Sequence, residues 1–88
     1  MIKVAHYDNF CGRFCAASRA LLNWSQDRLS SETGVARKTI SDFEMALRQP
    51  HARTKKDLLS AFEQHGIRFI VSSEGRSLIL LDKNQKAV

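Results

Sequence analysis

Apolar side chains near the start of the chain recur at the spacing of a helix. Between residues 10 and 22 they stand mostly three or four positions apart, at Phe10, Phe14, Ala17, Leu21 and Leu22. Such a stripe is typical of a helix that packs one face on a core. We therefore predict a first helix from about Phe10 or Cys11 to Asn23.

The C-terminal half combines another helix with two strands. This helix is predicted to begin at Thr54, which has Asp57 at capping-box spacing, and to end at Gly66. Its buried residues should be Leu58, Leu59, Ala61 and Phe62. Alternating apolar residues over 67–71, a turn over 72–76 and an apolar run over 78–81 then predict a β-hairpin.

The segment between these parts, Ser25 to Glu44, carries the most specific pattern. Its first helix is predicted to run from Gln26 to about Thr33. Leu29 and Ile40 can meet only if the chain turns steeply after this helix, and Gly34 can take the positive φ of such a turn. The pattern predicts a helix-turn-helix. Its second helix, over 36–46, presents a polar face that suits the major groove of DNA, formed by Arg37, Lys38, Thr39, Ser41 and Asp42.

The charge of the chain also favours a nucleic acid. Among 88 residues, 14 are Lys or Arg and 9 are Asp or Glu, which gives a pI near 9.7. From Arg37 to Lys56 there are six basic residues and two acidic ones, so much of the excess follows the polar face. With no long apolar run and no signal-peptide pattern, we expect no membrane association and a cytoplasmic protein.

Several spaced residues resemble the phage-repressor helix-turn-helix family, which includes Cro, the lambdoid repressors and XRE-type regulators. They are the run RALLNWSQ from Arg19, then Leu29, Gly34-Val35, Thr39-Ile40-Ser41 and Glu44. The resemblance covers about residues 11–69. It implies a mainly α, four- to five-helix lambda-repressor-like DNA-binding domain, here followed by a C-terminal β-hairpin.

The resemblance also implies roles for individual residues. In this family the position of Arg19 pairs with that of Glu44, although a solvated arginine and an independent glutamate are the alternative. The position of Gln26 contacts a DNA phosphate at a helix N-terminus, unless it is simply a solvent-facing residue. The loop after the motif lies along the DNA backbone, which makes Arg48 and Arg53 candidate phosphate contacts.

Within the polar face, Arg37 and Lys38 are the first candidates for base-edge or phosphate contacts, with guanine as the favoured base. Thr39, Ser41 and Asp42 come second, because an aspartate can accept from cytosine N4 but repels phosphates. The alternative is an ordinary solvated face. Ala36 stands where relatives have a serine or threonine N-cap, which costs about 1 kcal/mol and leaves amides that a DNA phosphate can bind.

The chemistry of the chain gives no case for an enzyme. Cys11 and Cys15 lie four apart with His6 upstream, but three ligands without a fourth are a weak zinc pattern. We interpret both cysteines as reduced, partly buried thiols and expect no metal and no cofactor. Three scattered histidines and isolated acids form no catalytic arrangement.

We divide the chain into a tail or short strand over 1–9, a DNA-binding domain over 10–66, a hairpin over 67–82 and a tail over 83–88. A lone hairpin is hardly stable in water, and its second strand is apolar on both faces. A second copy is the simplest cover, which predicts a homodimer through Phe69, Val71, Leu78, Ile79 and Leu80. The alternative is a hairpin on its own helices, with Ile2 to Val4 as a third strand.

Two functions follow from these features. In the first, the chain is a sequence-specific double-stranded DNA-binding regulator, most simply a repressor, that binds a palindromic operator as a dimer. In the second, it is a protein-interaction module, such as an antitoxin or an antiactivator that binds a regulatory protein. The basic surplus favours the first function. Ala36, Asp42 and the apolar hairpin leave the second open.

Overall fold

The computed structural model describes residues 2–4, 10–72, 74 and 76–82. Its elements are β1 (Ile2–Val4), α1 (Gly12–Leu22), α2 (Gln26–Thr33), α3 (Arg37–Glu44), α4 (Ala52–Gln64), β2 (Ile67–Ser72) and β3 (Ser77–Leu81). The predictions on His6, on turn residues 73 and 75 and on the tail over 83–88 lie outside the described residues. The expected mainly helical fold with a C-terminal hairpin is confirmed.

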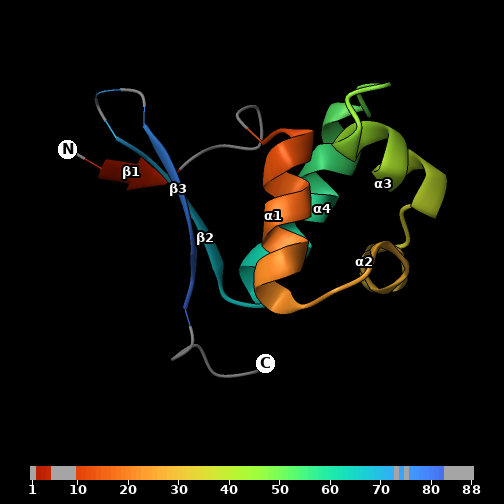
Figure 1. Ribbon diagram of the computed structural model, residues 1–88, viewed down its shortest axis with the longest axis horizontal. Helices are drawn as coiled ribbons and strands as arrows, with labels where there is room; N and C mark the ends of the chain where they lie inside the picture. The colour runs from red at the N-terminus through yellow and green to blue at the C-terminus, as the bar shows by residue number, and fades with distance from the viewer. Residues whose placement is uncertain (1, 5–9, 73, 75, 83–88) are drawn as a thin grey trace.

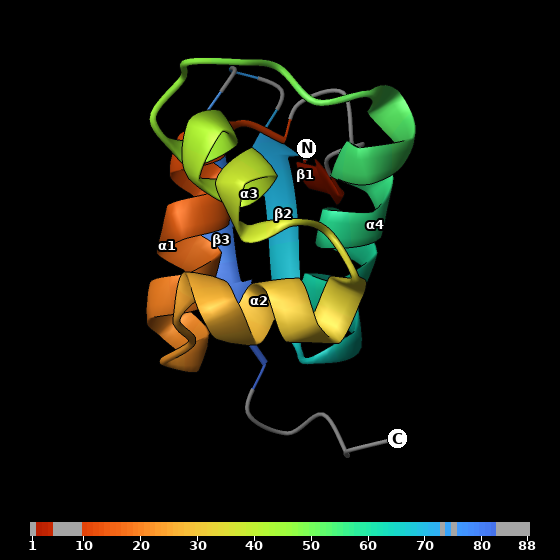
Figure 2. The ribbon, with the colours of Figure 1, turned by 90° about the vertical axis from the view of Figure 1, so that its right-hand side faces the viewer.

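The elements form layers. The three strands lie on one side of the molecule, next to α1 and α4 (Figure 1). The helices α2 and α3 lie on the opposite side, so that in Figure 2 the sheet is seen behind them, between α1 and α4. The α2–α3 pair is therefore held far from the sheet, with an outer surface of its own.

The phase of α1 differs from the prediction. Ala17 and Leu21 are exposed, whereas Cys15 and Ser18 are fully buried. Ser18 can be buried because its hydroxyl donates to the carbonyl oxygen of Phe14 at 2.7 Å. The apolar stripe therefore predicted the burial of Ala17 and Leu21 wrongly. It left out the small thiol of Cys15 and the hydroxyl of Ser18, which bonds within its own helix.

Phe10, just before α1, joins the layers. Its ring lies 5.7 Å from that of Phe43 on α3, 6.0 Å from that of Phe62 on α4 and 5.3 Å from that of Phe69 on β2, measured between ring centroids. All four side chains are buried. Since tilted aromatic pairs at these distances are favourable beyond the area they bury, Phe10 links the sheet to α3 and α4.

Gly12 allows α1 to begin directly against the end of α3. A Cβ at this position would lie 2.1 Å from the carbonyl oxygen of Phe43 and 2.9 Å from the Cα of Glu44. No side chain fits there unless the helices separate. Gly12 therefore brings α1 and α3 into close contact, which outweighs its cost to helix propensity.

The start of α4 also differs from the prediction. The helix begins at Ala52, after Pro50 and His51, and the N–H of Lys55 already bonds the carbonyl of His51 at 3.1 Å. Thr54 is thus inside the helix and does not cap it with Asp57. The helix ends at Gln64 with His65 as its C-cap, and Gly66, which was predicted to end it, follows with a φ of +97°.

The hairpin packs on its own helices. β2 is the central strand, antiparallel to both β1 and β3, with Phe69 opposite Ile79 and Ile67 opposite Leu81. Ile67 and Phe69 are buried, and Ile79 and Leu81 pack against the core. This matches the alternative in which Ile2–Val4 is a third strand. Phe69 was therefore wrongly predicted to contact a partner subunit.

Two leucines are exposed on the other face of the sheet. Leu78 and Leu80 on β3 are 53% and 46% exposed, and they lie opposite Ile70 and Arg68 of β2. The side chain of Val71, also predicted at a dimer contact, is outside the described part. Among the described helices, none is long and apolar enough to span a membrane.

Candidate nucleic-acid interface

The turn between α2 and α3 has the predicted geometry. Gly34 has a φ of +78°, and its N–H bonds the carbonyl of Ser30 at 2.8 Å. Thr33 supports the turn, since its hydroxyl donates to the carbonyl of Leu29 at 2.7 Å and accepts from the N–H of Val35 at 3.1 Å. Leu29 and Ile40 are both fully buried. The two helices are thus fixed to each other by backbone, hydroxyl and core contacts.

The start of α2 is capped as its sequence predicts. Ser25 accepts a hydrogen bond from the N–H of Arg28 at 2.9 Å, and the helix runs over the predicted residues, Gln26 to Thr33. Arg28 in turn lies over the ring of Trp24, 4.9 Å from its centroid, and pairs with Glu32 at 2.8 Å. Arg28 therefore holds the start of α2 to Trp24, in the turn between α1 and α2, and to the next turn of its own helix.

Arg19 and Glu44 form a paired contact between α1 and the end of α3. Arg19 Nη2 lies 2.6 Å from Glu44 Oε1, and its Nε donates to Oε2 at 2.8 Å. The remaining Nη1 donates to the carbonyl of Trp24 at 3.0 Å. Because both carboxylate oxygens are used and the Glu44 side chain is only 6% exposed, this pair fixes the angle at which α3 leaves the core.

Two further donors on Glu44 were not predicted. The thiol of Cys15 donates to Oε2 at 3.1 Å, and Gln26 Nε2 donates to Oε1 at 3.1 Å. Cys15 and Arg19 are four residues apart on α1, so their shared face was the available sequence signal. The phosphate contact that the resemblance implies for Gln26 has to be made by a side-chain amide that already donates to Glu44.

Burial and hydrogen bonds within this cluster shift the pKa values of Glu44 and Cys15. Burial acts to raise the pKa of Glu44, but the hydrogen bonds from Arg19, Cys15 and Gln26 outweigh it, so the pKa lies below its ordinary value. Burial, followed by the hydrogen bond to Glu44, raises the pKa of the Cys15 thiol well above its ordinary value. Cys15 is therefore a protonated donor in the core and has no thiolate reactivity.

The outward face of α3 is polar along its length. Arg37 lies 3.2 Å from Asp27 at the start of α2, and both side chains are exposed. Lys38 lies 3.4 Å from Asp42, one turn further along the same helix. Thr39 is partly exposed between them. Both cations are exposed and their contacts are long, so both can leave their partners for an anion at little cost.

The N-termini of α3 and α4 have no side-chain cap. Ala36 and His51 occupy the N-cap positions, neither makes a capping hydrogen bond, and neither helix has an acidic residue in its first turn. The first amides of each helix are therefore not bonded by a cap. Together with nearby cations they favour an anion at both places.

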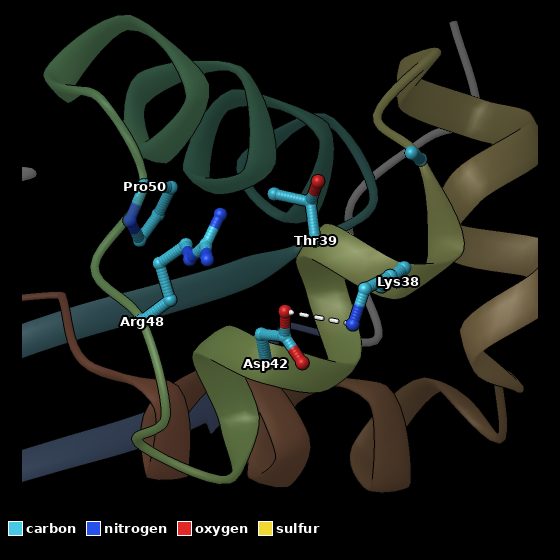
Figure 3. Close-up of a pocket in the computed structure, with 6 residues that line it drawn as sticks. Lys38, Thr39, Asp42, Arg48 and Pro50 are labelled. Atoms are coloured by element: carbon cyan, nitrogen blue, oxygen red, sulfur yellow. Dashed lines mark hydrogen bonds and ion pairs between the residues drawn. The ribbon is translucent and has the colours of Figure 1, made fainter.

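A hollow lies beside α3 (Figure 3), with a volume of about 240 Å³. Arg48 and Pro50 bound it on the loop side, and Lys38 and Asp42 on the helix side. Leu47 is exposed in this loop, because α3 ends at Glu44 and Ala46 has a φ of +60°.

Arg53 does not lie in the loop as predicted. It is in the first turn of α4, where it lines another hollow with Ala52, Lys56 and Asp57. Arg48 and Arg53 are both exposed, on either side of Pro50. The basic segment is therefore part loop and part helix. Among the described residues, no three His, Cys, Asp or Glu side chains lie together as a possible metal site.

The sequence matches no protein-family model and no curated protein. The function of α3 is therefore inferred from its own geometry and charge. This helix is rigidly held and has a polar outward face, two cations at its start and basic residues on the segment that follows it.

Proposed function

We propose that this chain is a sequence-specific, double-stranded DNA-binding transcription regulator with a lambda-repressor-like domain. The observation that carries the proposal is α3 itself. Its apolar side is buried through Ile40 and Phe43, and Glu44 ties its end to α1, while its whole outward face is polar. A protruding helix of this kind fits the major groove, where its side chains can meet base edges.

Charge supports the same proposal. Arg37 and Lys38 stand in the first turn of α3, Arg48 in the loop, Arg53 in the first turn of α4 and Lys56 just after that turn. In the complex, the uncapped amides of both helices bind phosphates, and these side chains neutralise further ones. Such contacts set affinity and register, and the α3 side chains add sequence preference.

The proposal includes a homodimer. β3 is an edge strand of the described sheet, and its Leu78 and Leu80 are exposed on the face away from the helices. An exposed apolar edge favours pairing with another strand, and a second copy is the simplest source. In the dimer, two α3 helices meet two half-sites of a palindromic operator, and binding over a promoter represses it. Of the five residues first assigned to this contact, Leu78 and Leu80 carry the proposal, because Phe69 and Ile79 pack on their own core.

The same exposed leucines favour the second function, an interaction module such as an antitoxin or an antiactivator. In that case Leu78 and Leu80 bind a regulatory protein, and α3 has no DNA partner. Affinity for DNA decides between the two functions. A stable complex with another protein, in the absence of any DNA affinity, supports the second.

The test is fluorescence anisotropy on duplex DNA from around the protein's own gene, at two salt concentrations. We compare the wild type with Arg37→Ala/Lys38→Ala and, as a control matched in charge, Arg13→Ala/Arg76→Ala, which removes two exposed arginines outside α3. We expect selective binding that weakens steeply with salt and is lost only in the α3 variant. Equal binding by all three proteins, or none by the wild type, would refute the proposal.

A further inference from the structure

One ion pair on α3 occupies a particular place on the proposed interface. Lys38 Nζ lies 3.4 Å from Asp42 Oδ2, one helical turn away, and this pair lines two hollows at once. The first hollow is completed by Ala36, Thr39, Arg48 and Pro50, and the second by Gln26, Arg37 and Ser41. The pair is thus a ridge between two hollows, and Figure 3 shows both side chains beside the first of them.

The two side chains differ in how freely they can move. The Lys38 side chain is 87% exposed, whereas that of Asp42 is only 19% exposed. The carboxylate is therefore held near the helix surface, and the ammonium can swing outward by its four-carbon stem. A fixed acceptor next to an adaptable donor is a suitable arrangement for reading one base pair.

The chemistry of the pair points to a particular base pair. A lysine ammonium only donates hydrogen bonds, and an ionised aspartate only accepts them. In the major groove, guanine presents two acceptors, N7 and O6, beside the amino donor N4 of its cytosine. Resting on the proposed DNA-binding function, we propose that Lys38 and Asp42 act as one unit that selects a G·C pair, with Lys38 on guanine and Asp42 on cytosine.

Asp42 also disfavours other bases in place of the cytosine. A guanine or thymine in place of the cytosine would turn an acceptor toward the carboxylate, which is repulsive. A T·A pair offers one acceptor to Lys38 and one donor to Asp42, so it is the nearest competitor; guanine is preferred because it offers the ammonium two acceptors. Lys38 offsets the charge that would otherwise make an aspartate unfavourable near DNA phosphates.

The experiment is selection of binding sites from a random duplex library by the wild type, Lys38→Ala, Asp42→Asn and Glu32→Gln. Glu32 is the matched control, because it also pairs with a cation one turn away, Arg28, but on α2, where it lies beside His65. Circular dichroism and thermal unfolding establish that each variant is folded. Affinities for the selected site and its single-base variants are then measured by anisotropy.

We expect Lys38→Ala and Asp42→Asn to reduce discrimination at the same base pair by about tenfold each. Asp42→Asn should also shift the preferred base opposite it toward adenine, since asparagine both donates and accepts. Glu32→Gln should keep the wild-type preference. If the two variants change the preference at different base pairs, or leave it unchanged, the proposal that Lys38 and Asp42 act as one unit is wrong, while the proposed DNA binding stands. If the wild type selects no sequence, the proposed function is wrong, and so is the proposal that Lys38 and Asp42 act as one unit.

Discussion

Breaking the Arg19–Glu44 pair should destabilise the whole domain. The two side chains are 19% and 6% exposed, and the two hydrogen bonds between them are 2.6 and 2.8 Å long. Removing one partner leaves the other charge with too few hydrogen-bond partners in a poorly solvated place. Loss of one member of a buried pair costs about 3–5 kcal/mol, and because Arg19 is partly exposed we expect about 3 kcal/mol for Arg19→Met or Glu44→Gln. For a domain stable by about 5–10 kcal/mol, this is a large loss.

The assay is urea unfolding of the wild type, both single variants and the Arg19→Met/Glu44→Gln double variant. In the double variant the new amide oxygen can still accept from one of Cys15 and Gln26, and no charge is left unpaired. We therefore expect it to lose about 2 kcal/mol less than the sum of the single losses. A double loss equal to that sum would refute the pairing as the source of stability.

The same pair predicts a pH dependence. The pKa of Glu44 is lowered in the folded state, so its contribution is complete above the unfolded-state value of about 4.5 and is lost as the pH falls through the folded-state value. Wild-type stability should therefore fall on acidification more steeply than that of Glu44→Gln. Parallel curves for the two proteins below pH 5 would contradict this assignment.

Three further experiments test other parts of the structure. Gly12→Ala should lower the free energy of unfolding by about 2 kcal/mol in urea, because its Cβ meets a carbonyl of α3, instead of raising it by about 1 kcal/mol through helix propensity; a more stable variant would contradict the close approach. Leu78→Lys/Leu80→Lys should give a folded monomer in analytical ultracentrifugation at concentrations where the wild type is a dimer, and a monomeric wild type would refute the dimer. With a thiol reagent at pH 8, Cys11 should react at once and Cys15 only on unfolding, since Cys15 is buried and its pKa is raised; two fast thiols would show that the core is open.

Local patterns in the sequence predicted the local parts of the fold. Gly34 and the spacing of Leu29 and Ile40 predicted the turn between α2 and α3, and alternation predicted the hairpin. These features depend on φ preferences and periodicity within a few residues. A resemblance was needed for the Arg19–Glu44 pair, because its members are 25 residues apart.

What the sequence did not predict depends on contacts between distant segments. The phase of α1 is set by Cys15 and Ser18, whose burial follows from a carboxylate on α3 and from a bond within the helix. The role of Gly12 appears only when the end of α3 is placed beside it. Which face of the hairpin is covered depends on how it packs on α1 and α4, and alternation alone leaves this open.

The most direct test of the central claim is to map the DNA contact on the protein by amide chemical shifts. The labelled protein is titrated with its selected duplex and, in parallel, with a duplex of scrambled sequence. We predict that the selected duplex shifts the amides at the N-termini of α3 and α4 and in the loop around Arg48, and that the scrambled duplex shifts them less. Shifts confined to β3, or none with either duplex, would contradict the claim that α3 binds DNA.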